Sequence, residues 1–104
     1  MCGFVGFLSN QELNENSLDE IILDMSNELF LRGPDDFGSW ISQSDQVALG
    51  FRRLSIQDLS QAGHQPMISS NDRYVICFNG EIYNHLKLRE FLNANCVDSL
   101  WRGN

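Results

Sequence analysis

The sequence predicts a single α+β domain built on antiparallel strands. Three observations lead to this prediction: an apolar run at residues 2–9, one apolar helical stripe after it, and two later pairs of short apolar runs joined by turn-forming residues. The 104 residues, of which 42% are hydrophobic and 20% charged, suit one hydrophobic core. No internal repeat, low-complexity tract or linker-like change of composition predicts a domain boundary within the chain.

A strand and a helix are predicted in the first third of the chain. The run 2–9 mixes glycine with large apolar side chains, which is typical of a buried strand that lies close to a neighbouring backbone. Ser17 and Glu20 have the spacing of a capping box, so we expect a helix to begin at Ser17. Gly33 and Pro34 are expected to end it. Its single apolar stripe consists of Leu18, Ile21, Ile22, Met25 and Leu29.

Two hairpins are predicted in the middle of the chain. The runs 37–42 and 46–52 flank a short polar turn and are expected to pair. The runs 67–68 and 74–78 flank a Ser-Ser-Asn-Asp sequence and are expected to form a second hairpin. The polar segment 57–65 between the hairpins is expected to be a loop.

The last predicted element is a helix that begins after Asn84 as its N-cap and ends around Asn93. Its modest apolar stripe consists of Leu88, Phe91 and Leu92. Residues 96–104 keep large apolar side chains without a terminating signal, as at the start of a strand. We therefore expect a domain that is incomplete at its C-terminus, with unpaired edge strands and a tendency to associate.

Charge and apolar run length argue against several classes of partner. Seven Lys and Arg against 14 Asp and Glu give a net charge of -7, which disfavours binding to nucleic acid or to an anionic membrane surface. The longest apolar runs, such as 74–78, are far shorter than the roughly 20 residues of a membrane-spanning helix. The first residues lack the pattern of a secretory signal, so a cytoplasmic location is expected.

The cysteines and histidines predict neither a disulfide framework nor a metal site. Cys2, Cys77 and Cys96 form an odd set in a chain without an export signal, so free thiols are expected. Their spacing relative to His64 and His85 contains no paired ligand pattern. Neither histidine has an obvious carboxylate partner in the sequence, so both are expected in turns or on the surface, outside the mechanism.

Cys2 is a candidate nucleophile. Removal of Met1 before this small residue would give Cys2 a free α-amino group beside its own thiol, and such an amine can accept and return a proton near neutral pH. The alternative, which the local sequence alone favours, is a small apolar side chain packed in a strand.

Two further patterns are candidates for substrate contacts. Asn79 and Gly80 follow the run 74–78 directly, so a turn there can present a side-chain amide and a backbone N–H as oxyanion donors. An ordinary Asn-Gly turn is the alternative, although a helix rather than a strand is predicted to follow. Arg32 and Arg53 are candidates for binding a carboxylate through paired N–H groups, and surface salt bridges explain both equally well.

Several sequence blocks resemble, in order and spacing, the amidotransferase domain of glutamine-hydrolysing asparagine synthetases. These blocks are Met-Cys-Gly at the start, Arg-Gly-Pro-Asp at 32–35, Arg-Leu-Ser-Ile-Gln-Asp at 53–58, Gly-His-Gln-Pro-Met at 63–67 and Phe-Asn-Gly-Glu-Ile-Tyr-Asn-His at 78–85. Several blocks agreeing in order are more specific than any single short pattern. The resemblance implies a class II glutamine amidotransferase with an Ntn-hydrolase-like αββα sandwich of antiparallel sheets, of which residues 1–104 form the N-terminal part.

The resemblance also implies a role for each candidate residue. Cys2 attacks the side-chain amide of glutamine, releases ammonia and forms a thioester that water hydrolyses, with its own amine carrying the proton. The Asn79 side chain and the Gly80 N–H hold the oxyanion. Arg53 binds the α-carboxylate of glutamine, and Glu81 helps to receive its α-ammonium group. The backbone lining of the same pocket comes from Leu54, Ser55, Ile56 and Gln57.

The chain departs from the family pattern in two respects. Leu31 stands where the family usually has a histidine, so we expect a pocket altered at its edge, which the Arg32 loop shapes. The family's domain continues past Asn104, where an Asp that binds the α-ammonium group is implied, into a synthetase domain that uses ATP and Mg²⁺. No cofactor is predicted for residues 1–104, and we expect them to be inactive by themselves.

The whole enzyme is implied to convert aspartate to asparagine with ammonia taken from glutamine, through its own C-terminal synthetase domain. Two alternatives stay open. A related enzyme can deliver the ammonia to another carboxylate, such as that of a surface-polysaccharide sugar. A non-catalytic module would keep the fold, with Met1 intact and Cys2 serving only in packing. A homodimer is one option for the assembly.

Overall fold

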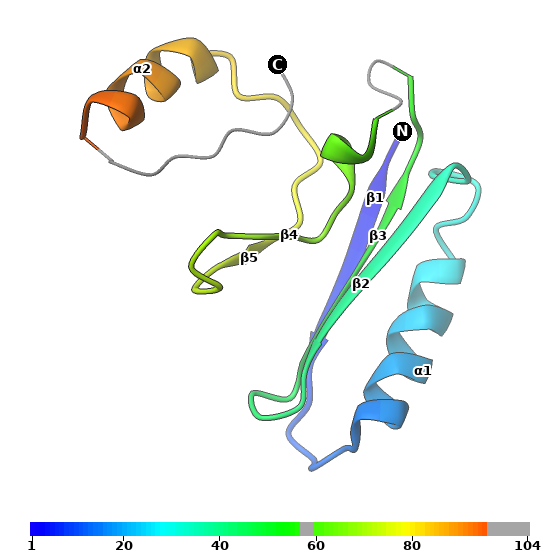
Figure 1. The fold of residues 1–104 in the computed structure, drawn as a ribbon. Coiled ribbons are helices and arrows are strands. Elements are labelled where there is room, and N and C mark those ends of the chain that lie inside the picture. Colours follow the sequence, from blue (N-terminus) through cyan, green and yellow to red (C-terminus); the bar gives the residue numbers. More distant parts are fainter. Residues whose placement is uncertain (57–59, 96–104) are drawn as a thin grey trace.

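The computed structural model describes residues 1–56 and 60–95 (Figure 1). The elements, in chain order, are β1 (Gly3–Leu8), α1 (Glu15–Asn27), β2 (Asp36–Ser42), β3 (Val47–Arg53), the 3-10 helix η1 (Gln61–Gly63), β4 (Met67–Ile68), β5 (Val75–Ile76) and α2 (His85–Asn95). All strand pairs are antiparallel. The predicted α+β class is confirmed.

β1, β3 and β2 form a three-stranded sheet in that order, and α1 covers one of its faces (Figure 1). The central strand β3 pairs Gly50 with Val5 of β1 and with Ser39 of β2. Leu18, Ile22 and Ala48 are completely buried between α1 and this sheet. Burial of these apolar side chains is what holds α1 on the sheet.

The helix and the central strand approach closely at Gly50. A Cβ atom at this position would collide with the hydroxyl of Ser26 and lie 3.2 Å from Cγ1 of Ile22. Ser26 is completely buried, and its hydroxyl donates a hydrogen bond of 2.7 Å to the Ile22 carbonyl one turn earlier. This local bond satisfies the polar group, so a serine occupies a place in the buried stripe that apolar periodicity does not predict.

Both predicted ends of the first helix are wrong. α1 begins at Glu15, because the Asn14 side chain caps it by accepting a hydrogen bond of 2.8 Å from the Ser17 N–H. Ser17, the predicted cap, therefore lies in the first turn. The helix ends at Asn27, and the chain then turns until the Gly33 N–H donates to the Leu29 carbonyl. The predicted stripe also differs, since Ile21 is 39% exposed.

Both predicted hairpins are confirmed, with shifted bounds. The β2–β3 pair extends one residue beyond each predicted outer end. The second hairpin pairs only β4 with β5, so the predicted strand 74–78 is reduced to Val75–Ile76. In the predicted loop 57–65, residues 61–63 form η1, capped by the Ser60 hydroxyl; residues 57–59 lie outside the described part.

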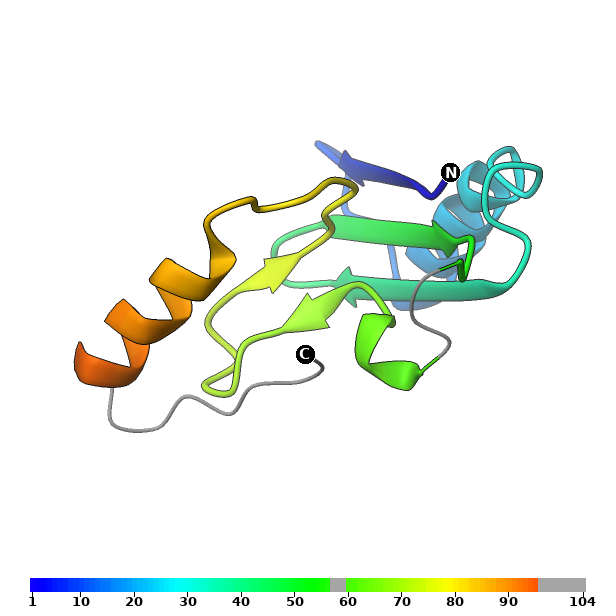
Figure 2. The ribbon, with the colours of Figure 1, turned by 90° about the horizontal axis from the view of Figure 1, so that it is seen from above.

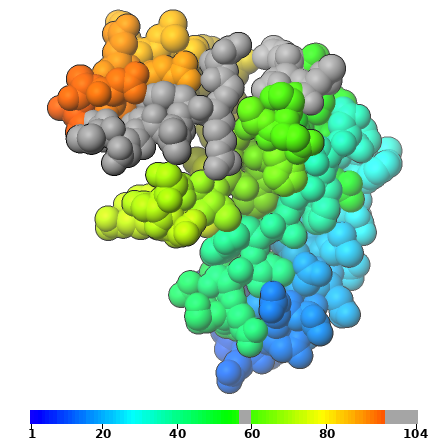
Figure 3. All heavy atoms as spheres, in the orientation of Figure 1, coloured from blue at the N-terminus to red at the C-terminus, as the bar shows by residue number. Residues whose placement is uncertain are grey.

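The views in Figures 1 and 2 show the same order of layers: α1, the three-stranded sheet, the two-stranded sheet and α2. This is the order of an αββα arrangement. Figure 3 shows the β4–β5 hairpin projecting from the body formed by α1 and the larger sheet. No buried residue belongs to α2, and no other described helix or strand packs against it.

The second helix begins at His85 and ends at Asn95, two residues beyond the predicted end. Its predicted stripe lies at the surface, with Phe91 64% exposed. The strand start predicted at 96–104 lies outside the described residues. Within the described ranges, no helix has both the length and the apolar character needed to cross a membrane.

Candidate active site

A cavity of about 390 Å³ lies where the start of β1 meets the end of β3 and the segment after β5. Its lining consists of Met1, Cys2, Phe51, Arg53, Leu54, Ile56, Gly63, Gln65, Phe78, Asn79, Gly80 and Glu81. The fold thus brings together predicted site residues from three distant segments. Among the predicted residues that the structure describes, Ser55 is not in this lining. The Ser55 N–H donates to Asp35, and Gln57 lies outside the described residues.

Cys2 is held at both its thiol and its carbonyl. The Leu54 N–H donates to the Cys2 Sγ over 3.4 Å, and the same sulfur lies 3.8 Å from the Leu54 carbonyl oxygen. The Cys2 carbonyl oxygen accepts hydrogen bonds from the Asn79 side-chain amide at 3.0 Å and from Nε of Arg32 at 3.3 Å. The thiol is free and only half-buried, in a pocket rather than in the core. This placement favours a reactive thiol over a packing role.

The donors expected at Asn79 and Gly80 line the same pocket as this thiol. The hydrogen bond from the Asn79 amide to the Cys2 carbonyl joins the turn to the residue that bears the sulfur. A helix follows the turn, so Asn79 and Gly80 do not form the tip of a hairpin. A side-chain amide and a backbone N–H on a turn that lines a pocket are suited to binding a developing oxyanion.

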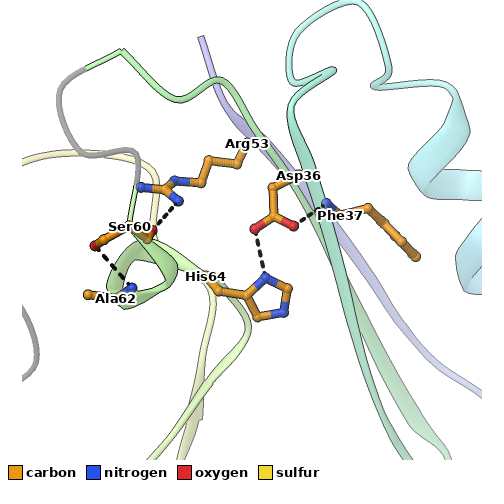
Figure 4. Close-up of polar contacts among 6 residues, drawn as sticks. All are labelled: Asp36, Phe37, Arg53, Ser60, Ala62 and His64. Carbon is orange, nitrogen blue, oxygen red and sulfur yellow. Dashed lines mark hydrogen bonds and ion pairs between the residues drawn. The ribbon is translucent and has the colours of Figure 1, made fainter.

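Arg53 is a buried residue of the pocket and not a surface arginine. It is 8% exposed, and its Nη1 donates a hydrogen bond of 2.7 Å to the Ser60 carbonyl (Figure 4). A Cβ atom at Gly63 would collide with its guanidinium group, so this glycine allows η1 to lie against Arg53. A guanidinium group fixed in this way is suited to binding a carboxylate.

The loop at 33–35 supports the same end of β3. The Asp35 N–H donates to the Arg53 carbonyl at 3.0 Å, and the Asp35 carboxylate accepts the Ser55 N–H at 2.8 Å. A Cβ atom at Gly33 would collide with the backbone between Arg52 and Arg53. Leu31 is 94% exposed and does not line the pocket, so the altered edge expected there is not found.

The prediction that His64 has no carboxylate partner is wrong. Its Nδ1 lies 2.7 Å from the Asp36 Oδ2, and the other oxygen of Asp36 accepts the Phe37 N–H (Figure 4). The two partners are 28 residues apart in sequence, so only the fold brings them together. The pair fastens the segment after η1 to the start of β2.

The contacts of Gln65 are not predicted by the sequence. Its side chain lines the pocket and forms two hydrogen bonds with the backbone of Phe78. The block Gly-His-Gln-Pro-Met at 63–67 is part of the family pattern, but it does not indicate that the Gln65 side chain binds Phe78. Among residues 1–56 and 60–95, no cluster of three or more His, Cys, Asp or Glu side chains is placed to hold a metal ion.

Burial raises the pKa of the Cys77 thiol by desolvation. Cys77 does not line the pocket. A raised pKa lowers the fraction of thiolate at a given pH, so desolvation makes Cys77 a weaker candidate for the nucleophile.

Comparison with known proteins agrees with this geometry. A family model described as "Glutamine amidotransferase domain" matches residues 1–101. Asparagine synthetase [glutamine-hydrolyzing] 1 of Bacillus subtilis is 42% identical over 95 residues, which cover 90% of this chain and 15% of that protein. A putative asparagine synthetase [glutamine-hydrolyzing] 2 of Methanocaldococcus jannaschii is 36% identical over 109 residues, covering 89% of this chain and 21% of that protein.

A probable asparagine synthetase [glutamine-hydrolyzing] of Schizosaccharomyces pombe is 45% identical over 73 residues, covering 70% of this chain and 13% of that protein. The chain therefore spans only a small part of the length of these relatives. The family model, in contrast, matches nearly all of the chain, and the pocket holds the cysteine, amide and guanidinium groups that the motifs predict. The chain belongs to the family of glutamine amidotransferase domains.

Proposed function

We propose that the full protein to which this chain belongs hydrolyses glutamine at Cys2 and supplies the ammonia for asparagine synthesis. The observation that carries the proposal is the half-buried Cys2 thiol in a pocket that also holds Asn79, Gly80 and Arg53. The pocket thus combines a nucleophile, donors for an oxyanion and a cation for the substrate carboxylate. The similarity to glutamine-hydrolysing asparagine synthetases supports the same reaction.

The reaction begins after removal of Met1, which frees the α-amine of Cys2. This amine takes the thiol proton, and the sulfur forms a bond to the amide carbon of glutamine while the carbonyl electron pair moves to oxygen. The Asn79 amide and the Gly80 N–H stabilise the resulting oxyanion. The electron pair then returns, the carbon–nitrogen bond breaks, and the leaving nitrogen takes the proton from the amine to depart as ammonia.

Water completes the cycle by attacking the thioester carbon. The amine removes one proton from this water, the carbon–sulfur bond breaks, and the proton returns to sulfur, so that glutamate and a free thiol remain. Throughout, Arg53 holds the α-carboxylate and Glu81 contributes to the site for the α-ammonium group. Leu54 and Ile56 line this end of the pocket.

The acceptor of the ammonia is aspartate in our proposal. ATP and Mg²⁺ would activate that carboxylate in a synthetase domain of the kind that the relatives' names indicate. The pocket offers a thiol, two side-chain amides, a guanidinium group and one carboxylate, a set that does not fit an Mg²⁺ site, so no step at Cys2 runs through the metal. The proposed location is the cytoplasm, where a reducing environment would keep the Cys2 thiol free.

The test uses the full product of the reading frame that contains this chain. We expect it to release ammonia from glutamine, and we expect Cys2→Ala to lower this rate by at least about a thousandfold, since the nucleophile is removed. Cys77→Ala is the matched control and should keep the activity. A glutamine-like diazoketone should label Cys2 alone, as peptide mass spectrometry would show.

Two results would contradict the proposal. One is a label on Cys77 or Cys96 with Cys2 unmodified. The other is an undiminished rate of glutamine hydrolysis by protein whose intact mass shows that Met1 is retained, because the amine of Cys2 is then blocked.

A further inference from the structure

Gln65 pairs with the backbone of Phe78 through both ends of its side-chain amide. Its Oε1 accepts a hydrogen bond of 2.6 Å from the Phe78 N–H, and its Nε2 donates one of 3.0 Å to the Phe78 carbonyl. Phe78 directly precedes Asn79, whose amide reaches Cys2. The side chain of Gln65 therefore fixes the residue from which the oxyanion turn begins.

The register of the two-stranded sheet explains why a side chain, and not the backbone, forms these two hydrogen bonds with Phe78. Met67 lies opposite Ile76, and continuing the same antiparallel register by two residues would place Gln65 opposite Phe78. The ladder ends before this point, and Pro66 has no N–H to donate. The Gln65 amide, with one donor and one acceptor, supplies the pair of hydrogen bonds that a strand backbone would otherwise make.

The backbone of Gln65 is engaged elsewhere. Its carbonyl oxygen lies so close to Gly38 that a Cβ atom there would collide with it. The preceding His64 is fastened to Asp36, as Figure 4 shows. Both contacts anchor Gln65 to β2 of the larger sheet. Gln65 thus links the larger sheet to the turn that carries the proposed oxyanion donors.

We propose that Gln65 is a positioning residue that sets the location of the Asn79 and Gly80 donors relative to the Cys2 thiol. The proposal rests on the proposed glutamine hydrolysis and adds a residue to its machinery. The donors act on an oxyanion that exists only in the transition state and the tetrahedral intermediate. Loss of the Gln65 bridge should therefore lower kcat and leave the KM for glutamine unchanged, because Arg53 keeps its own support from Ser60.

The experiment compares Gln65→Glu and Gln65→Leu with Gln61→Glu in the full product of the reading frame. Gln65→Glu keeps the size of the side chain and an acceptor for the Phe78 N–H but sets a carboxylate oxygen against the Phe78 carbonyl. Gln61 lies in the same segment, is exposed, and offers a matched substitution away from Phe78. Both Gln65 variants should lose about tenfold to a hundredfold in kcat, the effect expected of a catalytic group displaced by about 1 Å.

An inhibitor gives a second readout that does not depend on turnover. The Cys2 thiol adds to the aldehyde group of glutamate γ-semialdehyde. A carbon–sulfur bond forms, and the thiol proton passes to the aldehyde oxygen. The tetrahedral product places that oxygen at the oxyanion donors. Its inhibition constant should rise in the Gln65 variants by the same factor as kcat falls, and it should not change in Gln61→Glu.

Three results would overturn the proposal: an unchanged kcat in both Gln65 variants, a KM that rises together with the loss of kcat, or an unchanged inhibition constant. If both variants lose the thermal unfolding transition of the wild type, Gln65 is a folding residue and the proposal also fails. A wild-type protein without glutamine hydrolysis would refute the proposed function itself, which is a distinct outcome.

Discussion

Arg52 and Arg53 are neighbours in sequence and serve opposite faces of β3. Arg52 lies toward α1, with its guanidinium carbon 5.4 Å from the ring centre of Phe30 and 4.8 Å from that of Phe37, and it donates to Asn27. Arg53 faces the pocket and Ser60. Because side chains alternate along a strand, only one of two adjacent arginines can face the pocket, and the pairing of β3 decides which one does.

Cys77 should react slowly with alkylating reagents in the native protein. Burial raises the pKa of its thiol, so at a given pH the folded protein has less Cys77 thiolate than the unfolded chain, and the thiolate is the reacting form. At about pH 8, we expect iodoacetamide to modify native Cys77 more slowly than Cys77 in urea. The difference between the two alkylation rates should narrow as the pH rises through the pKa of Cys77 in the folded protein, because the thiolate then forms in both states.

Time courses of peptide mass spectra at several pH values would measure these rates. Cys2 in the same sample serves as the internal comparison, since it lines the pocket. Equal alkylation rates for native and urea-unfolded Cys77 at every pH would show that its surroundings do not protect the thiol.

At the scale of the element, the start of α1 depends on Asn14. Its side chain accepts the Ser17 N–H, so Asn14→Ala removes the cap and should lower the free energy of unfolding by about 1 kcal/mol. Ser17→Ala removes no capping acceptor that the structure shows and should have a smaller effect. Urea denaturation of both variants would measure the two values. A larger loss of unfolding free energy for Ser17→Ala than for Asn14→Ala would instead support the capping box predicted from the sequence.

The elements themselves could be predicted, because apolar periodicity and turn residues are local signals. The strands of the larger sheet and both hairpins illustrate this. The start of α1 could not be predicted, because Asn14 and Ser17 are both favourable N-cap residues and the Ser17–Glu20 spacing fits a capping box. Ser26 and Gly50 show a second limit. The burial of this helical serine can be predicted only when the glycine that packs against it is known.

Long-range pairs mark the same limit within the candidate active site. Cys2, Arg53 and Asn79 were identified from motifs that each residue carries in its own segment. The groups that hold the site in place, Gln65 and the pair of His64 with Asp36, contact partners 13 and 28 residues away. No local pattern encodes such a partnership, because it depends on the register of the strands.

At the scale of the whole molecule, β1 exposes apolar side chains on the sheet face opposite α1. Phe4 is 51% exposed and Leu8 74% exposed on this face of β1. Exposed apolar side chains on an edge strand favour association, so the 104-residue chain by itself should form oligomers that bind a hydrophobic dye. Leu8→Lys should reduce the association without lowering the unfolding temperature, because Leu8 contributes little buried area.

Sedimentation velocity would measure this association. Leu31→Lys is the matched control, since Leu31 is 94% exposed and lies outside the sheet. If the chain is monomeric, or if Leu31→Lys disperses the oligomers as well as Leu8→Lys does, the sheet face is not the cause.

The two hydrogen bonds to the Cys2 carbonyl have a consequence for maturation. An aminopeptidase that removes the first methionine cuts the peptide bond on the other side of this residue, and Met1 is 74% exposed. The hydrogen bonds from Arg32 and Asn79 to the Cys2 carbonyl therefore remain after this cleavage. Removal of Met1 would expose the α-amine of a residue that is already held in position, so activation would need no refolding of the surrounding structure.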